Sequence, residues 1–468
     1  MKNSDLFINE SDYPDFPVGQ AAAHLQQAIR FPTVSRIDTS KVDYDVFSRF
    51  HAFLRKTYPR IAALAKWMKF GHSLLIRLDG LDATLQPVLL MAHQDVVPVK
   101  AGTEHQWVHP PFSGDLADGY IWGRGAMDIK EMLIGHLEAA EYLLSRGQHL
   151  KRTLYLAFGE DEETCSTGAM AICRYFLEQG IRLAFVLDEG SGDVTDAADY
   201  GAPGRLVCTV GVYEKGYGDL RLTVRGRGGH SSNPFCGTSL GILAGAVSRV
   251  LDNPPRPLLN DCVRSSLRIL APFISVEPMK TWLRDIDRHE HDLLNWFMSR
   301  ESLYHQVSTT IAPTMITEGA PAANVMPQDM SAVINFRFAP QDTPESVMAH
   351  YRALLDADVS LEWEQQITAS RPSSLDTGGF DALKRVLEHY FSPLIFLPVQ
   401  NRGATDCRQY EPVCPCCLRF GPFLEEEDIS SEGIHGTNER ISVRAYAQGI
   451  RVLIRLIRVL CVDAEVLL

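Results

Sequence analysis

The sequence lacks several features that would assign it to a particular class of protein. No run of about 18 consecutive apolar residues occurs, so we expect neither a transmembrane helix nor a membrane as partner. The segment from Met1 to Pro17 is polar and acidic, unlike a secretory signal peptide. With 10 cysteines in 468 residues, the chain is not a small scaffold held by disulfides. These absences predict reduced thiols in a cytoplasmic protein.

Positive charge is scarce relative to negative charge. The chain has 45 lysine and arginine residues against 58 aspartate and glutamate residues, which gives a net charge of −13. This balance argues against nucleic acid and against an anionic membrane surface as partners. Hydrophobic residues make up 45% of the chain and charged residues 22%, as in an ordinary globular protein. The length favours about two or three domains.

The first part of the chain alternates short apolar runs with helix-like stretches. Runs that are apolar on both faces are typical of buried strands in a parallel sheet. They lie at 74–76, 88–91, 154–158 and 184–187. Helix-like stretches at 131–145 and 168–179 separate them. This alternation predicts an α/β fold.

The pattern changes near Gly216. A strand that alternates apolar and polar residues follows, and then a helix, two strands and a helix, in the order of an open-faced α+β module. After the first strand, at 220–224, these elements are predicted at 239–251, 308–316, 330–338 and 344–355. A polar, helix-prone stretch at about 253–305 interrupts them, and the chain closes with a helix at about 443–460. We therefore predict a discontinuous first domain, at 1–214 and 369–468, interrupted by a second domain at 215–368.

Histidine and carboxylate side chains follow the ends of the predicted strands. In an open α/β sheet, ligands bind outside the carboxyl ends of the strands, so these side chains are expected to converge. They include His93, Asp95, Asp128, Glu160 to Glu163, Asp188, Glu189 and, much later, His435 and Glu439. Taken singly, each has a simpler explanation, such as a helix N-cap at Asp188. Together, so many negative charges require compensation, which a divalent metal supplies.

Imidazole and carboxylate without thiolate suit Zn²⁺, with Co²⁺ or Mn²⁺ as alternatives. Two ions about 3.5–4 Å apart that share one carboxylate would use about five such ligands. Cys414 and Cys417 have the spacing of half a structural zinc site, but no second pair lies nearby. Buried thiols are the simpler explanation of those cysteines.

Six motifs, in this order, resemble a known family. They are Leu90–Pro98, Trp122–Asp128, Gly159–Glu163, Val186–Gly190, Gly228–Ser232 and His435–Glu439. The family is that of the co-catalytic zinc enzymes aminoacylase-1, glutamate carboxypeptidase and succinyl-diaminopimelate desuccinylase. Within it, Pro110–Gly114 and Asp188–Gly190 are most similar to the carboxypeptidase S branch, which includes the N-fatty-acyl-amino-acid hydrolases. The resemblance covers nearly the whole chain, from about Ala22 onward.

The resemblance implies a fold and a set of metal ligands. The fold is a zinc-peptidase catalytic domain with a mixed, largely parallel sheet, interrupted by a ferredoxin-like β-α-β-β-α-β domain that acts as a lid or dimerisation domain. The implied ligands of two divalent metal ions are His93, Asp128, Glu163, Asp188 and His435. Asp128 bridges both ions, His93 and Asp188 complete one site, and Glu163 and His435 complete the other.

The resemblance also implies roles around the metals. Glu162 is the general base, and Asp95 orients His93. The peptide bond between Asp128 and Ile129 is cis. His230 hydrogen-bonds the developing oxyanion, from the partner subunit in dimeric members of the family.

Three further residues resemble those that recognise the substrate. Asn324 and Arg337 correspond to the pair that binds the substrate's amide and its carboxylate, which a guanidinium can grip with two hydrogen bonds. Gly403 corresponds to a backbone contact near the same carboxylate. Arg402 replaces the glycine that usually precedes it, so the chain departs from the family's pattern at this contact.

Together these residues predict a metal-dependent amide hydrolase of the carboxypeptidase or aminoacylase type. Its substrate is a peptide or an N-acyl amino acid with a free carboxylate next to the scissile amide. The expected partners are this small molecule or short peptide and, through the inserted domain, a second copy of the chain. The stretch at 253–305 could instead supply the dimer's contacts within one chain. An aminopeptidase and a binding protein with a degenerate site are the alternatives.

Overall fold

The computed structural model describes residues 11–190, 194–234, 237–317, 319–391, 393–401, 403–425 and 433–464. The chain divides into two units. Unit 1 comprises Met1–Val212, Ser373–Asn401 and Thr405–Leu468, and unit 2 comprises Tyr213–Pro372 and Arg402–Ala404. The domain boundaries at 214/215 and 368/369 stay a prediction of the sequence. The short return of the chain at Arg402–Ala404 was not expected.

Unit 1 is built on a mixed sheet. In the described part of the chain it has nine strands, in the order β1-β2-β6-β3-β7-β17-β9-β16, with β8 paired to β9. The strands are β1 Lys66–Phe70, β2 Ser73–Leu78, β3 Val88–His93, β6 Leu154–Gly159, β7 Phe185–Asp188, β8 Val194–Asp196, β9 Leu206–Glu214, β16 Leu394–Asn401 and β17 Cys417–Arg419. Strand β3 is parallel to β6 and β7, and β17 is parallel to β7, whereas β2 is antiparallel to β1 and β6. The predicted buried strands are confirmed as β2, β3, β6 and β7.

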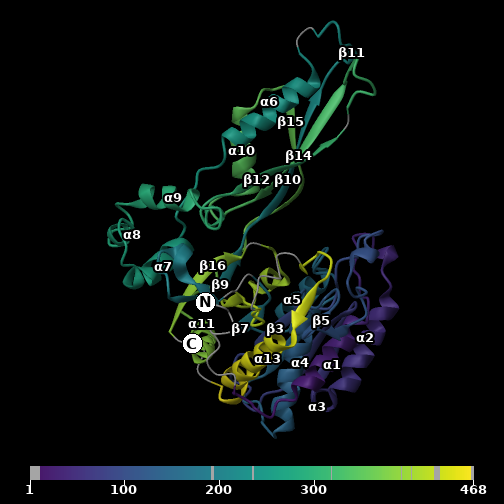
Figure 1. Cartoon of the computed structure of the whole chain (residues 1–468), viewed down its shortest axis with the longest axis vertical. Coiled ribbons are helices and arrows are strands. Elements are labelled where there is room, and N and C mark those ends of the chain that lie inside the picture. The colour runs from purple at the N-terminus through teal and green to yellow at the C-terminus, as the bar shows by residue number, and fades with distance from the viewer. Residues whose placement is uncertain are drawn as a thin grey trace. The chain divides into compact units, whose positions relative to one another are not determined.

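Helices cover this sheet (Figure 1). They are α1 Val18–Ile29, α2 Tyr44–Thr57, α3 Pro59–Leu64, α4 Lys130–Ser145, α5 Thr167–Glu178, α11 Gly378–Tyr390 and α13 Val443–Ile457. Helix α4 is buried along most of its length and packs against α1, α3 and α13. The helices predicted at 131–145, 168–179 and 443–460 are confirmed, the last continuing as a π-helical turn at Arg458–Val462.

A small sheet in unit 1 joins distant parts of the chain. Its strands are β4 Asp115–Ala117, β5 Tyr120–Trp122 and β18 Arg440–Ser442, in the order β18-β5-β4. Arg440 of β18 is paired with Trp122 of β5. The segment that ends at Glu439 therefore lies beside the segment that begins at Gly123.

Unit 2 contains an antiparallel sheet with the order β12-β14-β10-β15. The strands are β10 Tyr217–Arg225, β12 Thr310–Thr317, β14 Asp329–Arg337 and β15 Val359–Ile367. Helices α6 Ser239–Asp252 and α10 Pro344–Leu354 cover one face (Figure 1), where they bury alternate residues of the strands, such as Leu220, Leu222 and Phe336. These four strands and two helices follow one another in the order β-α-β-β-α-β, as the family resemblance implied.

Two additions complete unit 2. A short ribbon is formed by β11 Gly229–His230 and β13 Val325–Met326. The helix-prone stretch forms α7 Asp261–Leu270, α8 Met279–Trp282 and α9 Glu290–Met298. These three helices lie between α6 and β12 in the chain.

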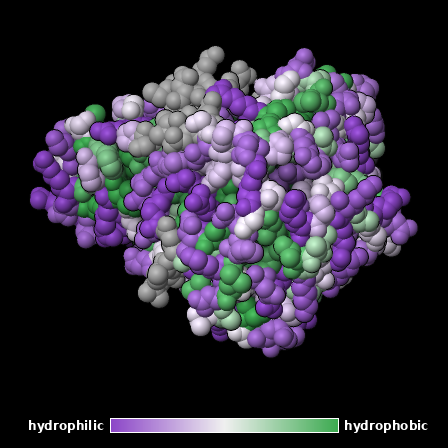
Figure 2. Space-filling view, turned by 90° about the horizontal axis from the view of Figure 1, so that it is seen from below, coloured by the Kyte–Doolittle hydropathy of each residue, from purple (hydrophilic) through white to green (hydrophobic). Residues whose placement is uncertain are grey.

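The surface and the thiols agree with the composition. Among the residues that the structure describes, no helix is both long and apolar enough to cross a membrane. The face shown in Figure 2 is mostly hydrophilic, with hydrophobic residues in separate groups. Cys414, Cys416 and Cys417 are buried free thiols. None of them belongs to a potential metal-binding group within the described residues.

Candidate metal centre

Two groups of histidine and carboxylate side chains meet in unit 1. In the described part of the chain, these are His93, Asp128 and Glu189, and Asp128, Glu163 and His435. Within each group, one ligand atom from each residue lies within 4.8 Å of the others. His93 ends β3, Glu163 follows β6 and Glu189 follows β7, so three adjacent strands present their carboxyl ends to the same place.

Asp128 belongs to both groups and offers each of them one oxygen. His93 Nε2 lies 3.0 Å from Asp128 Oδ1, and His435 Nε2 lies 2.9 Å from Asp128 Oδ2. Glu189 Oε1 is 3.3 Å from His93 Nε2, and Glu163 Oε2 is 3.0 Å from His435 Nε2. A carboxylate shared in this way is the arrangement of a two-metal site.

The donor set fits two divalent ions. It contains two imidazoles and three carboxylates, without thiolate, which is the chemistry of zinc and related metals. Glu163 Oε1 is buried and has no hydrogen-bond partner among the residues that the structure describes, so it retains a lone pair for a cation. The Asp128–Ile129 peptide that links Asp128 to the start of α4 is cis, as the family resemblance implied.

Asp95 holds both a ligand and the loop that carries Glu162. It is fully buried, and its backbone carbonyl lies 2.9 Å from His93 Nδ1. Donation from Nδ1 leaves the lone pair of Nε2 directed toward Asp128. The Asp95 carboxylate accepts hydrogen bonds from the backbone N–H groups of Glu162 (3.2 Å) and Glu163 (3.3 Å). It therefore fixes the position of Glu162 relative to His93.

The structure brings Glu189 into the first group, where the sequence had predicted its neighbour Asp188. Asp188 is the last residue of β7 and is buried, and it belongs to neither group. Successive side chains of a strand point to opposite faces, and Asp188 is the last residue of β7, so the two adjacent carboxylates are not equivalent neighbours of His93. Both residues were part of the motif recognised in the sequence, and only the backbone geometry distinguishes them.

Burial and charge shift the pKa values of these groups. Burial raises the pKa of Glu162 well above its ordinary value, and the carboxylates of Glu189, Asp406 and Glu163 add to this effect. Burial likewise raises the pKa of Glu189 to about 8. Hydrogen bonds to Asp128 and Glu163 raise the pKa of His435 to about 10. The carboxylates thus outnumber the histidines in a buried place, which favours binding of cations.

The predicted oxyanion and substrate residues lie in unit 2. His230 is exposed on β11, opposite Val325, and Ser231 N donates to Asn324 O at 3.0 Å, so His230 and Asn324 lie close together. Arg337 ends β14, and its guanidinium lies 4.7 Å from the centre of the Tyr217 ring. Among the residues described, no carboxylate forms an ion pair with Arg337. Gly403 is exposed and belongs to the short return of the chain in unit 2.

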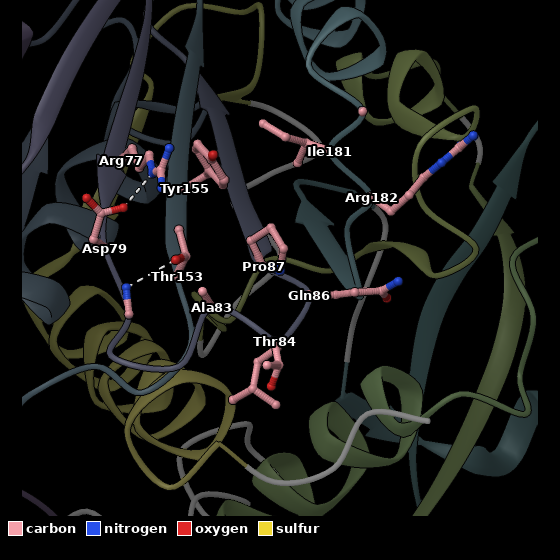
Figure 3. Close-up of a pocket in the computed structure, with 13 residues that line it drawn as sticks. Arg77, Asp79, Ala83, Thr84, Gln86, Pro87, Thr153, Tyr155, Ile181 and Arg182 are labelled. Atoms are coloured by element: carbon pink, nitrogen blue, oxygen red, sulfur yellow. Dashed lines mark hydrogen bonds and ion pairs between the residues drawn. The ribbon is translucent and has the colours of Figure 1, made fainter.

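A separate pocket of about 560 Å³ opens in unit 1 (Figure 3). Pro87 and Thr153, which line it, precede β3 and β6, whereas the metal-binding groups follow the ends of those strands. Arg77 and Asp79 form an ion pair at its wall, and Arg182 also lines it. The described residues that line it include no histidine and one carboxylate, so they offer no comparable metal site.

Comparison with known proteins agrees with this geometry. Residues 89–459 match the family model described as peptidase family M20/M25/M40. The chain is 34% identical over 443 residues to the probable carboxypeptidase S-like 2 of Dictyostelium discoideum, a match that covers 92% of this chain and 83% of that protein. It is 32% identical over 458 residues to the human N-fatty-acyl-amino acid synthase/hydrolase PM20D1, covering 94% and 88%. The fold resembles the crystal structure of the M20 family metallo-carboxypeptidase Sso-CP2 from Sulfolobus solfataricus, with a TM-score of 0.66, 17% identity, and coverage of 94% and 98%.

Proposed function

Because the chain belongs to peptidase family M20/M25/M40 and is a metallohydrolase acting on amide bonds, we propose that it cleaves a peptide or an N-acyl amino acid with a free carboxylate next to the scissile amide. The motif resemblance to this family, and to its carboxypeptidase S branch, is confirmed. The observation that carries the proposal is the pair of ligand groups that share Asp128. The names of two relatives, a probable carboxypeptidase S-like protein and an N-fatty-acyl-amino acid synthase/hydrolase, support the two substrate classes.

The five ligands divide into two sites. His93, Asp128 and Glu189 would hold one ion, and Asp128, Glu163 and His435 would hold the other. We propose Zn²⁺ in both sites, because imidazole and carboxylate, which make up both groups, are among the usual ligands of zinc. When bound, such ions polarise a carbonyl oxygen and lower the pKa of a bound water from about 15.7 toward about 7.

Glu162 is proposed as the general base. It lies next to the ligand Glu163, and its backbone is held by Asp95. Its raised pKa suits a carboxylate that accepts a proton from the attacking water and then donates it to the leaving amine. Such transfers typically contribute about 10²–10⁴-fold to the rate.

Substrate recognition is proposed to come from unit 2. Arg337 has a guanidinium that can bind a carboxylate with two parallel hydrogen bonds, and it lacks an acidic partner among the described residues. Asn324 would bind the substrate's amide, and His230 would donate to the oxyanion, a contact worth about 3–4 kcal/mol in well-placed cases. A backbone contact from Gly403 to the carboxylate completes this proposal.

A homodimer through unit 2 is also proposed. Strand β12 is an edge strand of the unit 2 sheet, and its residues Met315 and Ile316 are 55% and 69% exposed. Edge strands of this kind pair readily with a second chain. In such a dimer His230 would serve the site of the partner subunit. We further propose a reducing compartment such as the cytoplasm, in keeping with the free thiols of the described cysteines.

The proposal is tested by following release of free amino acid from a panel of substrates by mass spectrometry. The panel holds dipeptides, N-acetyl amino acids and long-chain N-acyl amino acids, each with a free or an amidated carboxylate. We expect cleavage that stops with chelator and requires the free carboxylate. Equal cleavage of amidated substrates would contradict the role of Arg337. Stoichiometric metal without any turnover would instead favour the alternative of a binding protein.

A further inference from the structure

Glu439 holds the backbone around Asp128 from a distant part of the chain. Its Oε1 accepts hydrogen bonds from three backbone N–H groups, those of Gly125 at 2.9 Å, Met127 at 2.9 Å and Asp128 at 3.3 Å. Its backbone carbonyl accepts a fourth, from Gly123 N at 2.8 Å. One residue therefore satisfies most of the backbone donors in the loop at 123–128.

Arg124, which belongs to the same loop, donates hydrogen bonds back to the segment that carries Glu439. Its Nη1 donates to Glu439 Oε2 at 2.5 Å, and its Nη2 donates to the carbonyl of Gly436 at 2.8 Å. Glu439 is fully buried, and Arg124 is 3% exposed. A buried carboxylate that is this completely hydrogen-bonded, with an arginine beside it, holds its surroundings in a single geometry. We call Glu439, Arg124 and the loop at 123–128 the Glu439 clamp.

The clamp connects the backbone beside His435 with the backbone of Asp128, two residues of the candidate metal centre. Gly436, which Arg124 contacts, follows His435 directly, and Glu439 contacts the N–H of Asp128 itself. The His435 side chain is 54% exposed, so packing alone does not fix it. Its distance from Asp128 therefore depends on the backbone at 435–439, which the clamp holds against the loop.

We propose that Glu439, together with Arg124, is a positioning residue of the metal centre, which sets the separation between the Asp128 carboxylate and the His435 imidazole. The inference rests on the proposed function, because it requires that these two side chains bind metal. Residues that orient metal ligands without touching the metal typically contribute about 10–100-fold to metal affinity. A purely structural role would lower stability without affecting the metal ions.

The test compares Glu439→Gln with Glu138→Gln in the full chain. Glutamine keeps the shape of Glu439 and removes the charge that faces Arg124. Glu138 is a matched control, because its carboxylate is also buried and bonds to Tyr58 OH at 2.8 Å and His24 Nδ1 at 2.5 Å, away from the metal ligands. Co²⁺ is added to metal-free protein, and its affinity, the visible absorption of the bound ion and the melting temperature of the metal-free protein are measured.

We expect both variants to lower the melting temperature, but only Glu439→Gln to weaken Co²⁺ binding, by about 10–100-fold, and to alter the absorption bands. Unchanged affinity and bands in Glu439→Gln would overturn the positioning role. If that variant does not fold, Arg124→Lys is measured instead. Lysine keeps the positive charge but cannot contact Glu439 and Gly436 at the same time in the way that the guanidinium does. We then expect altered absorption bands of the bound Co²⁺. Unaltered bands there would equally overturn the proposal. Wild-type protein that binds no Co²⁺ would refute the proposed function itself.

Discussion

At the scale of single residues, the centre depends on which of two adjacent carboxylates faces His93. The structure places Glu189 Oε1 3.3 Å from His93 Nε2. Glu189→Gln is therefore expected to lose about one metal ion per chain, because the amide is a poor ligand. Asp188→Asn is expected to keep both ions, as measured by elemental analysis of purified protein. The reverse result would support the original prediction that Asp188 is the ligand.

A second prediction concerns Glu162. Glu162→Gln should retain both metals but lose at least about 10²-fold in kcat, since the amide cannot accept the proton from water. Glu160→Gln is the matched control, because Glu160 lies in the same loop and its carboxylate is directed toward Gly71. Metal content and kcat are measured for both. Full activity of Glu162→Gln would remove it from the mechanism.

The same residues show how far the sequence determines the site. The sequence pointed to His93, Asp128, Glu163 and His435, which the structure brings together, because each lies in a motif that resembles the family's metal-ligand motifs. The nearness of Glu189 to His93 could not be read from the sequence, since it depends on how the backbone turns after β7. The hydrogen bonds of Glu439 to the loop at 123–128 were also beyond prediction, because 311 residues separate Glu439 from Asp128.

At the scale of secondary structure, helix α4 contains a buried histidine whose protonation is unfavourable in the folded protein. His136 is fully buried, and its Nε2 lies 3.0 Å from the carbonyl oxygen of Met91 in β3. Burial lowers its pKa from 6.5 to about 4, although the hydrogen bond to Met91 acts in the opposite direction. A depressed pKa means that the folded protein holds this imidazole neutral.

Acid is therefore expected to destabilise the fold through His136. Between about pH 6.5 and about pH 4 the unfolded chain binds the proton and the folded chain does not, so the free energy of unfolding falls as the pH falls. The full difference, reached below about pH 4, is about 3 kcal/mol. His136→Gln should flatten this dependence, measured by denaturant unfolding of metal-free protein, whereas His149→Gln, at an exposed position, should not. An unchanged slope in His136→Gln would contradict the assignment.

The elements themselves were largely predictable. Strands β2, β3, β6 and β7 are continuous apolar runs, and helices such as α4 have distinct patterns. Strand β17 was not predicted, because it spans only Cys417–Arg419 and its place between β7 and β9 is set by pairing with strands far away in the chain. Short strands leave little periodicity in a sequence, so the strands with which they pair determine where they form.

At the scale of the whole molecule, the proposed dimer predicts that activity can be shared. If His230 acts in the partner's site, mixing His230→Ala with Glu162→Gln should restore part of the activity, since some dimers then combine one intact base with one intact histidine. Each variant alone should be nearly inactive. Sedimentation establishes the oligomeric state, and a monomer, or a mixture without recovered activity, would contradict sharing.

The interrupted order of the chain has a consequence for how it can be divided. Strand β17, from the part that follows unit 2, lies between β7 and β9 from the part that precedes it, and β18 pairs with β5. Each half of unit 1 therefore completes the other's sheets. Two separately synthesised fragments, cut at an exposed turn in unit 2, should recognise each other and rebuild unit 1 without a covalent link. Two separate genes, each encoding a fragment that is inactive alone, would then together produce one active enzyme.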